Sequence, residues 1–348
     1  MAVSRLTKFG NDLYTGERSY NFVGRRRTWY IVAAIMLLIS IAVPIARGGF
    51  VFGIEFTGGS EFQVTNPESI DQQIAEDAVH SVDPEASPRV TIIGGSSIRV
   101  QTEQLTQEEN EAVRDALATA YDVPVEQVTA SFIGPTWGQD ITGSALRALV
   151  VFIVLAVVFM AIYFRTWKMS LAALVSLAHD IIITVGVYGV FGFEITPAAV
   201  IGFLTILGYS LYDTVVVFDK IRENTAETGP DSPRTFAEAV NLGVNQTLVR
   251  SINTGVVAAL PVASILFIGA FVLGAGTLRD IALALFIGIV VGTYSTIFIA
   301  APVYSQLREG EPDIRKHTEK VMAARAELAL AAEGTVPATA GASSSWSG

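Results

Sequence analysis

Six apolar runs, each about 17 to 27 residues long, constrain this chain more than any other feature of its sequence. A helix needs about 20 mainly apolar residues to cross the hydrocarbon core of a bilayer. Basic residues precede the first run, as in a signal peptide, but its length and its 28-residue polar leader favour a retained helix. We therefore predict a polytopic α-helical membrane protein, with six transmembrane helices over residues 29–46, 145–164, 169–192, 195–218, 243–273 and 281–307.

The composition excludes several classes of function. Charged residues make up only 16% of the chain, against about a quarter in an average soluble domain. The net charge of −10 argues against nucleic acid as a partner, and the absence of cysteine excludes disulfides and thiolate metal sites. The sequence also has no Walker loop, HExxH or GxSxG motif. We predict no enzymatic activity, no cofactor and no metal, so energy for transport would come from an ion gradient or a partner.

Lysine and arginine residues concentrate in alternate loops and so predict the orientation of the helices. They occur in the leader, between the second and third spans, between the fourth and fifth, and after the sixth. The two intervening loops, 193–197 and 274–277, contain none. Both termini are therefore predicted to be cytoplasmic. The predicted organisation is a cytoplasmic leader (1–28), helix one (29–46), an external domain (47–140), helices two to six (141–307) and a cytoplasmic tail (308–348).

The external segment is predicted to be a small ferredoxin-like α+β domain with the order βαββαβ. Alternating apolar residues predict strands on both sides of residues 58–59, the first over 52–56, and a hairpin around 94–95. Capping boxes that begin at Ser69 and Thr106 predict the starts of two helices, and a last strand precedes the second span.

The end of the chain has a different composition. After Arg325 it is rich in alanine, threonine and serine. Such a segment cannot bury a core, so we predict that the cytoplasmic tail is disordered there.

Asp213 is the clearest functional candidate in the spans, because a charged side chain at a helix centre costs about 2.5–3.5 kcal/mol on insertion scales. If Asp219 marks the cytoplasmic edge, Asp213 lies about 9 Å inside it. Tyr209 and Ser210 share its face of the helix, and Thr214 follows it. It is either a structural aspartate bound by these hydroxyls or a carboxylate that loads and releases a proton.

Arg250, in the first turns of the fifth span, is the natural counter-charge for Asp213 and lies close to Asn253 and Thr254. An arginine near a helix end also often extends to the lipid phosphates, so both interpretations stay open. As a pair, Asp213 and Arg250 would form an electrostatic switch that opens when the carboxylate is protonated.

His179 and Asp180 lie near the middle of the third span. Adjacent helical residues point about 100° apart, so these two side chains are not expected to share one direction. A structural role and a role in a proton relay have equal weight. Two ionisable residues at this depth nevertheless need a polar interior, which favours a transporter over an inert anchor. A GxxxG pattern over 288–292 permits close approach of helices.

Several of these motifs together resemble the SecF family, the smaller membrane subunits of the bacterial SecDF protein-export complex. The resemblance covers the membrane region and the external domain. It is carried above all by residues 208–224 (GYSLYDTVVVFDKIREN), with 178–180, 250–254 and 292–296 in support. After the first span, the matching residues are Gly53, Glu55, Phe56, Gly58 and Gly59, although the family usually has Asp where Glu55 stands.

The resemblance implies half of an RND-type transporter that pairs with SecD in the bacterial plasma membrane. Such a complex would use the proton gradient to promote late preprotein translocation and release through SecYEG, after SecA has acted. YajC and the translocating preprotein are further expected partners. By motif position, Asp213 and Arg250 match the proton-pathway residues of the family, and His179 and Asp180 are further candidates.

Two alternatives stay open. A half-size RND-like exporter of lipids or small molecules would usually have larger external loops and a second set of six spans. A purely structural scaffold for SecD would use the intramembrane charges only to lock helices together. Neutralising those charges as a pair would then leave export unaffected.

Overall fold

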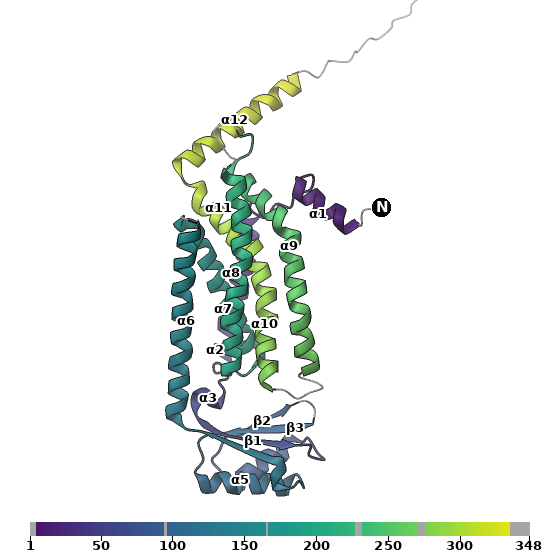
Figure 1. Cartoon of the computed structure of the whole chain (residues 1–348), viewed down its shortest axis with the longest axis vertical. Helices are drawn as coiled ribbons and strands as arrows, with labels where there is room; N and C mark the ends of the chain where they lie inside the picture. The colour runs from purple at the N-terminus through teal and green to yellow at the C-terminus, as the bar shows by residue number, and fades with distance from the viewer. Residues whose placement is uncertain (1–4, 94–95, 165, 227–231, 270–275, 335–348) are drawn as a thin grey trace, which may run out of the picture.

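The computed structural model describes every residue except 1–4, 94–95, 165, 227–231, 270–275 and 335–348. Within that part of the chain, six helices are long and apolar enough to cross a membrane. They run side by side in an elongated bundle with a small sheet domain at one end (Figure 1). The opposite end, which we call the terminal end, carries α1 (Arg5–Thr15) and α12 (Pro312–Gly334).

The spanning helices extend beyond the apolar runs that predict them. For example, α9 begins seven residues earlier than its predicted start at 243, because Thr235 and Glu238 form a capping box there. The predicted end of this span, at 273, lies outside the described residues. The six spanning segments are α2 (Arg26–Ala46), α6 (Pro135–Phe164), α7 (Trp167–Phe191), α8 (Pro197–Ala226), α9 (Phe236–Ser264) with the π-helical η2 (Ile265–Gly269), and α10 (Gly276–Ser295) with the π-helical η3 (Thr296–Ala300) and α11 (Ala301–Glu309).

Helices α7, α8 and α10 form the interior of the bundle, and α2, α6 and α9 lie at its periphery. Small residues bring α8 and α10 together. A methyl group on Gly288 would collide with Ile206, and one on Gly202 would lie 2.6 Å from Ala284 Cβ. The GxxxG pattern over 288–292 therefore lies on the face of α10 that packs against α8, as close packing in membranes requires.

The sheet domain has four antiparallel strands in the order β2-β3-β1-β4, and its helices cover the face turned away from the bundle (Figure 1). Its core contains Phe62, Val64, Ile98 and Leu117, all fully buried. This is the strand order of a βαββαβ ferredoxin-like fold. The predicted fold class is confirmed. The elements are β1 (Gly59–Thr65), α4 (Gln72–His80), β2 (Arg89–Ile93), β3 (Ser97–Thr102), α5 (Gln107–Ala120), η1 (Val125–Gln127) and β4 (Val128–Ile133).

Two details of this domain differ from the prediction. The expected strand over 52–56 is instead a short helix, α3 (Ile54–Thr57), which ends at Gly58 with a φ of 77°. The alternation of apolar residues predicted a strand, but the backbone here forms a helical turn. In this turn the Gly53 carbonyl accepts hydrogen bonds from the amides of both Phe56 and Thr57. Helix α4 is capped by Asp71 rather than Ser69. The capping box that begins at Thr106 forms as predicted, whereas residues 94–95 of the expected hairpin lie outside the described part.

The two ends of the chain also carry more structure than their composition suggested. Helix α1 lies in the polar leader and packs against α9, with Leu13 fully buried. Helix α12 continues past Arg325 to Gly334, so the predicted disorder is wrong for residues 326–334. Alanine, leucine and glutamate in that stretch are strong helix formers, which outweighs the lack of a core. Residues 335–348 lie outside the described part.

Candidate functional site

Polar side chains from four helices meet inside the bundle, roughly midway along α7 and α8. All are at most 5% exposed, although they lie in membrane-spanning helices, where buried polar groups often mark functional sites. We call this cluster the polar core. Its members are Ser176, His179, Asp180, Ser210, Asp213, Thr214, Ser251, Ser295 and Thr296.

Asp213 of α8 is only half satisfied within the polar core. Its Oδ1 accepts a hydrogen bond of 2.9 Å from the Ser251 hydroxyl of α9. Its Oδ2 is buried and has no hydrogen-bond partner among the described residues. A buried carboxylate without a cation or a full set of donors is costly, whereas the protonated acid is much less so. The geometry therefore suits a side chain that gains and loses a proton.

His179 and Asp180 form a second pair on α7. His179 Nδ1 lies 3.3 Å from Asp180 Oδ1, and Ser210 of α8 donates to Asp180 Oδ2. The two side chains therefore meet, although neighbouring helical positions diverge, because the flexible ends of both side chains turn toward each other. His179 Nε2 and the nearby Tyr294 hydroxyl are buried without partners among the described residues. This pair also has unused hydrogen-bonding capacity.

The third side of the polar core is the segment where α10 passes into η3. The Thr214 and Thr296 hydroxyls lie 3.0 Å apart, and Ser176 donates to Ser295 at 2.9 Å. Gly292 leaves room for the contact between Ser210 and Asp180, since a methyl group there would lie 3.1 Å from Ser210 Cβ and 3.7 Å from Asp180 Oδ2. Thr296 starts the π-helical turn, a distortion that is frequent at functional sites.

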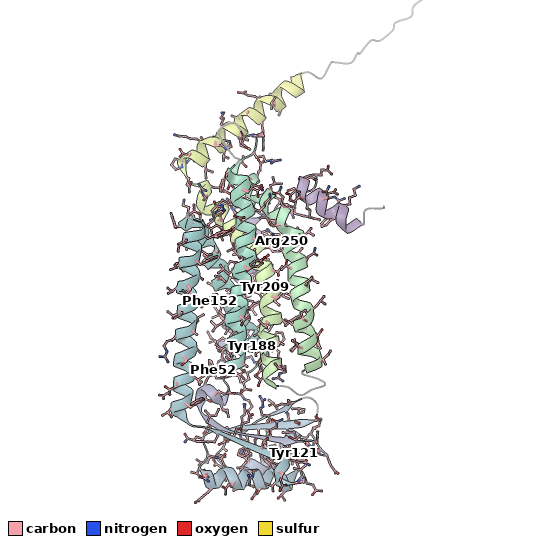
Figure 2. The ribbon with its side chains drawn as sticks, viewed as in Figure 1. Phe52, Tyr121, Phe152, Tyr188, Tyr209 and Arg250 are labelled. Atoms are coloured by element: carbon pink, nitrogen blue, oxygen red, sulfur yellow. The ribbon has the colours of Figure 1, made fainter. Side chains whose placement is uncertain are left out.

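Arg250 does not pair with Asp213 in this structure. Its side chain is exposed on the outside of α9, and no carboxylate among the described residues lies within ion-pair distance of it. The reason is helical geometry: Ser251 faces Asp213, so its neighbour must point about 100° away. In Figure 2, Arg250 lies on α9, and Tyr209 of α8 lies closer to the sheet domain than Arg250 does.

Arg250 lies 14 residues from the start of α9, or about 21 Å at 1.5 Å per residue, because this helix begins before the predicted span. Asp213 lies about 20 Å from the terminal end of α8 by the same measure, so the two residues share a similar depth. Asn253 is exposed and Thr254 half-buried, and neither belongs to the polar core.

Sequence reasoning missed Ser251 and the hydroxyls of Ser176, Ser295 and Thr296. Serine and threonine in a membrane-spanning helix commonly bond their own helix backbone, so their presence alone does not mark a site. Their placement beside residues of other helices marks them as part of the polar core. Ser251, Ser295 and Thr296 had one further signal, since they lie in the segments 250–254 and 292–296 that support the resemblance.

A second cluster of ionisable residues joins the sheet domain to the bundle, and we call it the junction. Arg99 of β3 lies 3.6 Å from Glu61 of β1 and 3.5 Å from Glu194 in the loop between α7 and α8. Gln101 donates to the same two carboxylates at 3.0 and 2.7 Å. Neither Arg99 nor Glu194 was predicted as a site residue.

The glycine motif after the first span belongs to this junction. Glu55 of α3 has a buried Oε2 without a partner among the described residues. Burial, then the nearby Glu194 and Glu61 carboxylates, raise the pKa of Glu55 above its usual range. A methyl group on Gly53 would lie 3.1 Å from Glu194 Oε1 and collide with Glu55. Gly59, at a φ of 145°, packs against the Thr102 carbonyl, so both glycines leave space that a side chain would fill.

Comparisons with known proteins give the family. Residues 112–310 match the model of the protein export membrane protein SecD/SecF, C-terminal. The protein translocase subunit SecF of Streptomyces coelicolor is 45% identical over 334 residues, which cover 95% of this chain and 88% of that protein. The chain belongs to the SecF family. The SecF subunit of Mycobacterium tuberculosis strain CDC 1551 is 40% identical over 91% of this chain and 73% of its own length.

A solved structure supports the same conclusion. The crystal structure of SecDF, a translocon-associated membrane protein from Thermus thermophilus, superposes with a TM-score of 0.72 at 29% identity. The match covers 84% of this chain but only 39% of the SecDF chain. This SecF-family chain is therefore a multi-pass membrane component of protein export that spans about two fifths of that larger protein.

Proposed function

We propose that this chain acts with a SecD subunit in the plasma membrane, and that proton binding at Asp213 helps to drive late steps of preprotein export through SecYEG. The SecDF structure supports the partnership, because one longer chain there includes a region like this one. We infer that both termini are cytoplasmic and that the sheet domain faces outward, toward the emerging preprotein. YajC remains a further proposed partner.

The observation that carries the proposal is the half-satisfied carboxylate of Asp213. Protonation of its free oxygen would convert a buried acceptor into a donor, and so change which neighbours it can bind. The surrounding contacts between α8, α9 and η3 are hydroxyl pairs and a hydroxyl–carboxylate bond rather than ion pairs. Such contacts re-form at low cost when helices shift, which suits a site that alternates between two states. The pair His179 and Asp180 would extend the relay toward α7.

The outward direction of Arg250 supports a partner against α9. Exposed Asn253, Val257 and Leu260 continue the same face of this helix toward the sheet domain. A charged residue at this depth rarely faces lipid, so a partner helix is expected to cover it. We propose that SecD covers this face, and that Arg250 turns to pair with ionised Asp213 in a second state of the cycle.

Replacement of Asp213 by asparagine tests the proposal, because the amide side chain keeps the shape and can accept the Ser251 hydrogen bond but cannot ionise. The measurement is proton-gradient-dependent secretion of a preprotein at equal abundance of the subunit in the membrane. We expect secretion to fall to the level seen without the subunit. Asp219→Asn is the matched control, since Asp219 lies on the same helix with a half-exposed side chain and pairs with Arg222 of its own helix.

The alternative of a structural scaffold predicts a different result. If Asp213→Asn supports the same proton-dependent secretion as Asp219→Asn, the carboxylate only holds helices together and the proton role is wrong.

A further inference from the structure

The sheet domain has one edge strand without the protection that edge strands usually carry. Within the described residues, β4 is the last strand in the sheet and pairs only with β1, so one row of its backbone N–H and C=O groups faces outward. Its register with β1 is unbroken from Gly59–Ile133 to Val64–Val128, which leaves no bulge. Its sequence, VTASFI, has no charge and no proline, and its four central residues are exposed.

The opposite edge strand is different. β2 begins with the exposed Arg89, and the Gln72 side chain donates a hydrogen bond of 3.2 Å to the Val90 carbonyl. Charges and covering side chains are the common means of blocking an edge against further pairing. The domain therefore protects β2 and leaves β4 open.

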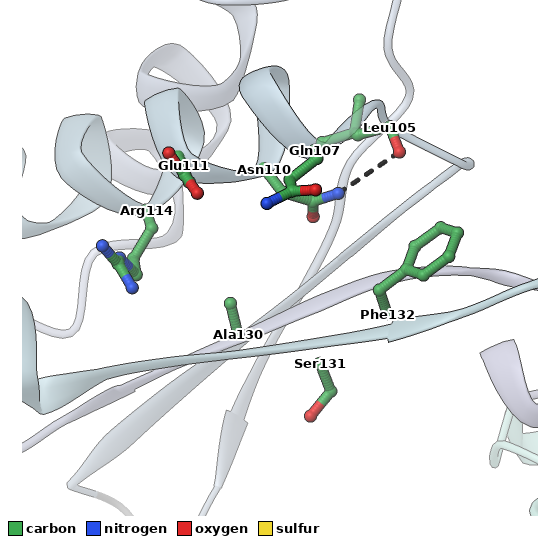
Figure 3. Close-up of a pocket in the computed structure, with 8 residues that line it drawn as sticks. All are labelled: Leu105, Gln107, Asn110, Glu111, Arg114, Ala130, Ser131 and Phe132. Carbon is green, nitrogen blue, oxygen red and sulfur yellow. Dashed lines mark hydrogen bonds between the residues drawn. The ribbon is translucent and has the colours of Figure 1, made fainter.

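A cavity lies directly beside the open strand. It has a volume of about 360 Å³, at the lower end of the range for ligand sites. Figure 3 shows it between α5 and β4, with Leu105, Ala130 and Phe132 on its apolar side. Phe132 is 52% exposed, which is unusual for a large side chain on the helix-covered face of a sheet. The space suits a side chain of an added strand, not a folded partner.

Two buried polar atoms in the cavity wall lack partners among the described residues. The Asn110 side-chain nitrogen donates to the carbonyls of Leu105 and Thr106 at 3.2 and 2.9 Å, which leaves its Oδ1 as an available acceptor. Arg114 Nε is an available donor, because the Asp115 carboxylate oxygen beside it is 3.8 Å away. Buried groups of this kind are costly unless a ligand satisfies them. A peptide backbone offers both the donor and the acceptor that they need.

We propose that the outer edge of β4 and the adjoining α5 cavity bind an extended, unfolded polypeptide segment by strand addition. The backbone of the segment pairs with β4, and one of its apolar side chains enters the cavity. Main-chain pairing gives affinity with little dependence on sequence, which suits a partner as varied as exported polypeptides. The choice of this occupant rests on the proposed export function.

The position of β4 gives such binding a mechanical consequence. Only Gly134 separates β4 from α6, so the bound strand is joined almost directly to a membrane-spanning helix. A movement of the bundle would reach the bound segment through this short link.

The test uses the full chain in nanodiscs and a labelled, unstructured peptide with apolar residues at alternate positions, with fluorescence anisotropy as the readout. We expect N-methylation of the central backbone nitrogens of the peptide to weaken binding by about tenfold or more, because it removes several hydrogen bonds and no side chain. Ala130→Arg, which fills the cavity, should weaken binding to a similar degree. The matched control on the protected edge is Ile92→Arg, at an exposed position on the same helix-covered face of the sheet, and it should change binding less than about twofold.

Equal binding of the methylated and unmethylated peptides would overturn strand addition, and this arm needs no protein variant that might misfold. A photo-crosslinking phenylalanine analogue at position 132 then identifies the occupant during export. Cross-links to a stalled preprotein support the proposal, whereas cross-links to SecD alone contradict it. Peptide binding needs no proton gradient, so a failure of the proposed role of Asp213 would leave this result unchanged.

Discussion

The polar core and the junction both bury carboxylates, but they satisfy them in opposite ways. In the polar core, Asp213 accepts a hydrogen bond from the Ser251 hydroxyl and has no cation within ion-pair distance among the described residues. At the junction, Arg99 and Gln101 hold Glu61 and Glu194 together. A carboxylate held by a cation stays ionised and fixes structure, whereas one bound only by hydroxyls can change its protonation state.

We propose separate tasks for the two clusters. The junction would hold the sheet domain on the bundle, and protonation in the polar core would supply the change that moves it. Asp213 lies on α8 and Glu194 in the loop that precedes this helix, so α8 connects the two clusters.

The largest expected effect on stability comes from Arg99→Gln. It removes the cation that Glu61 and Glu194 share and leaves two largely buried carboxylates together, which should cost about 3 kcal/mol. The measurement is thermal unfolding of the full chain, with limited proteolysis to report release of the sheet domain. Arg89→Gln is the control, since Arg89 is exposed on the edge strand β2. Equal effects of the two variants would contradict the proposed role of the junction.

A smaller effect is expected from Ser251→Ala, which removes the hydrogen bond to Asp213 Oδ1. The loss of one such bond is worth about 1 kcal/mol, so proton-dependent secretion should fall about fivefold. Ser264→Ala is the matched control on the same helix, because its exposed hydroxyl donates to the Leu260 carbonyl of its own helix. If both variants support the same proton-dependent secretion as the wild type, the hydrogen bond from Ser251 does not affect the function of Asp213.

The smallest effect should come from Glu55→Gln and should depend on pH. Because the folded state raises the pKa of Glu55, it binds this proton more tightly than the unfolded chain does. The stability of the wild type therefore falls as pH rises from the usual pKa of a glutamate through the raised value. Above that range, Glu55→Gln should be more stable than the wild type by about 1 kcal/mol or less, and below it the two should be equal.

Glu109→Gln gives the opposite sign in the same titration. Hydrogen bonds from the Thr106 amide and hydroxyl lower the pKa of Glu109. Its contribution is therefore present above the usual pKa of a glutamate and is lost as pH falls through the lowered value. Parallel pH profiles for the Glu55 and Glu109 variants would contradict the account of the junction.

The sequence predicted the architecture well because its signals are strong and local. Apolar runs mark the spans, and the capping box at Thr106 marks a helix start by the contacts of its own residues. The strand predicted over 52–56 failed because alternation cannot reveal that the Gly53 carbonyl binds two following amides. Local patterns thus indicated the elements but not every backbone bond.

The sequence predicted one part of the candidate site, Asp213, but not the residue that binds it. Asp213 stood out because a charge in an apolar run is rare. Its partner was chosen by charge, and Arg250 was the obvious cation at that depth. Which of two adjacent residues faces Asp213 depends on the rotation of α9, and that is set by packing between helices. The structure places the neutral Ser251 there instead.

Infrared spectroscopy of the full chain with SecD in lipid, recorded across a pH titration, most directly tests whether Asp213 exchanges a proton. We predict that the carbonyl signal of protonated carboxylic acids, which disappears as pH rises, loses one component in Asp213→Asn and keeps that component in Asp219→Asn and in Glu55→Gln. If the pH-dependent signal is the same in Asp213→Asn as in the wild type, another group carries the proton and the central claim is wrong.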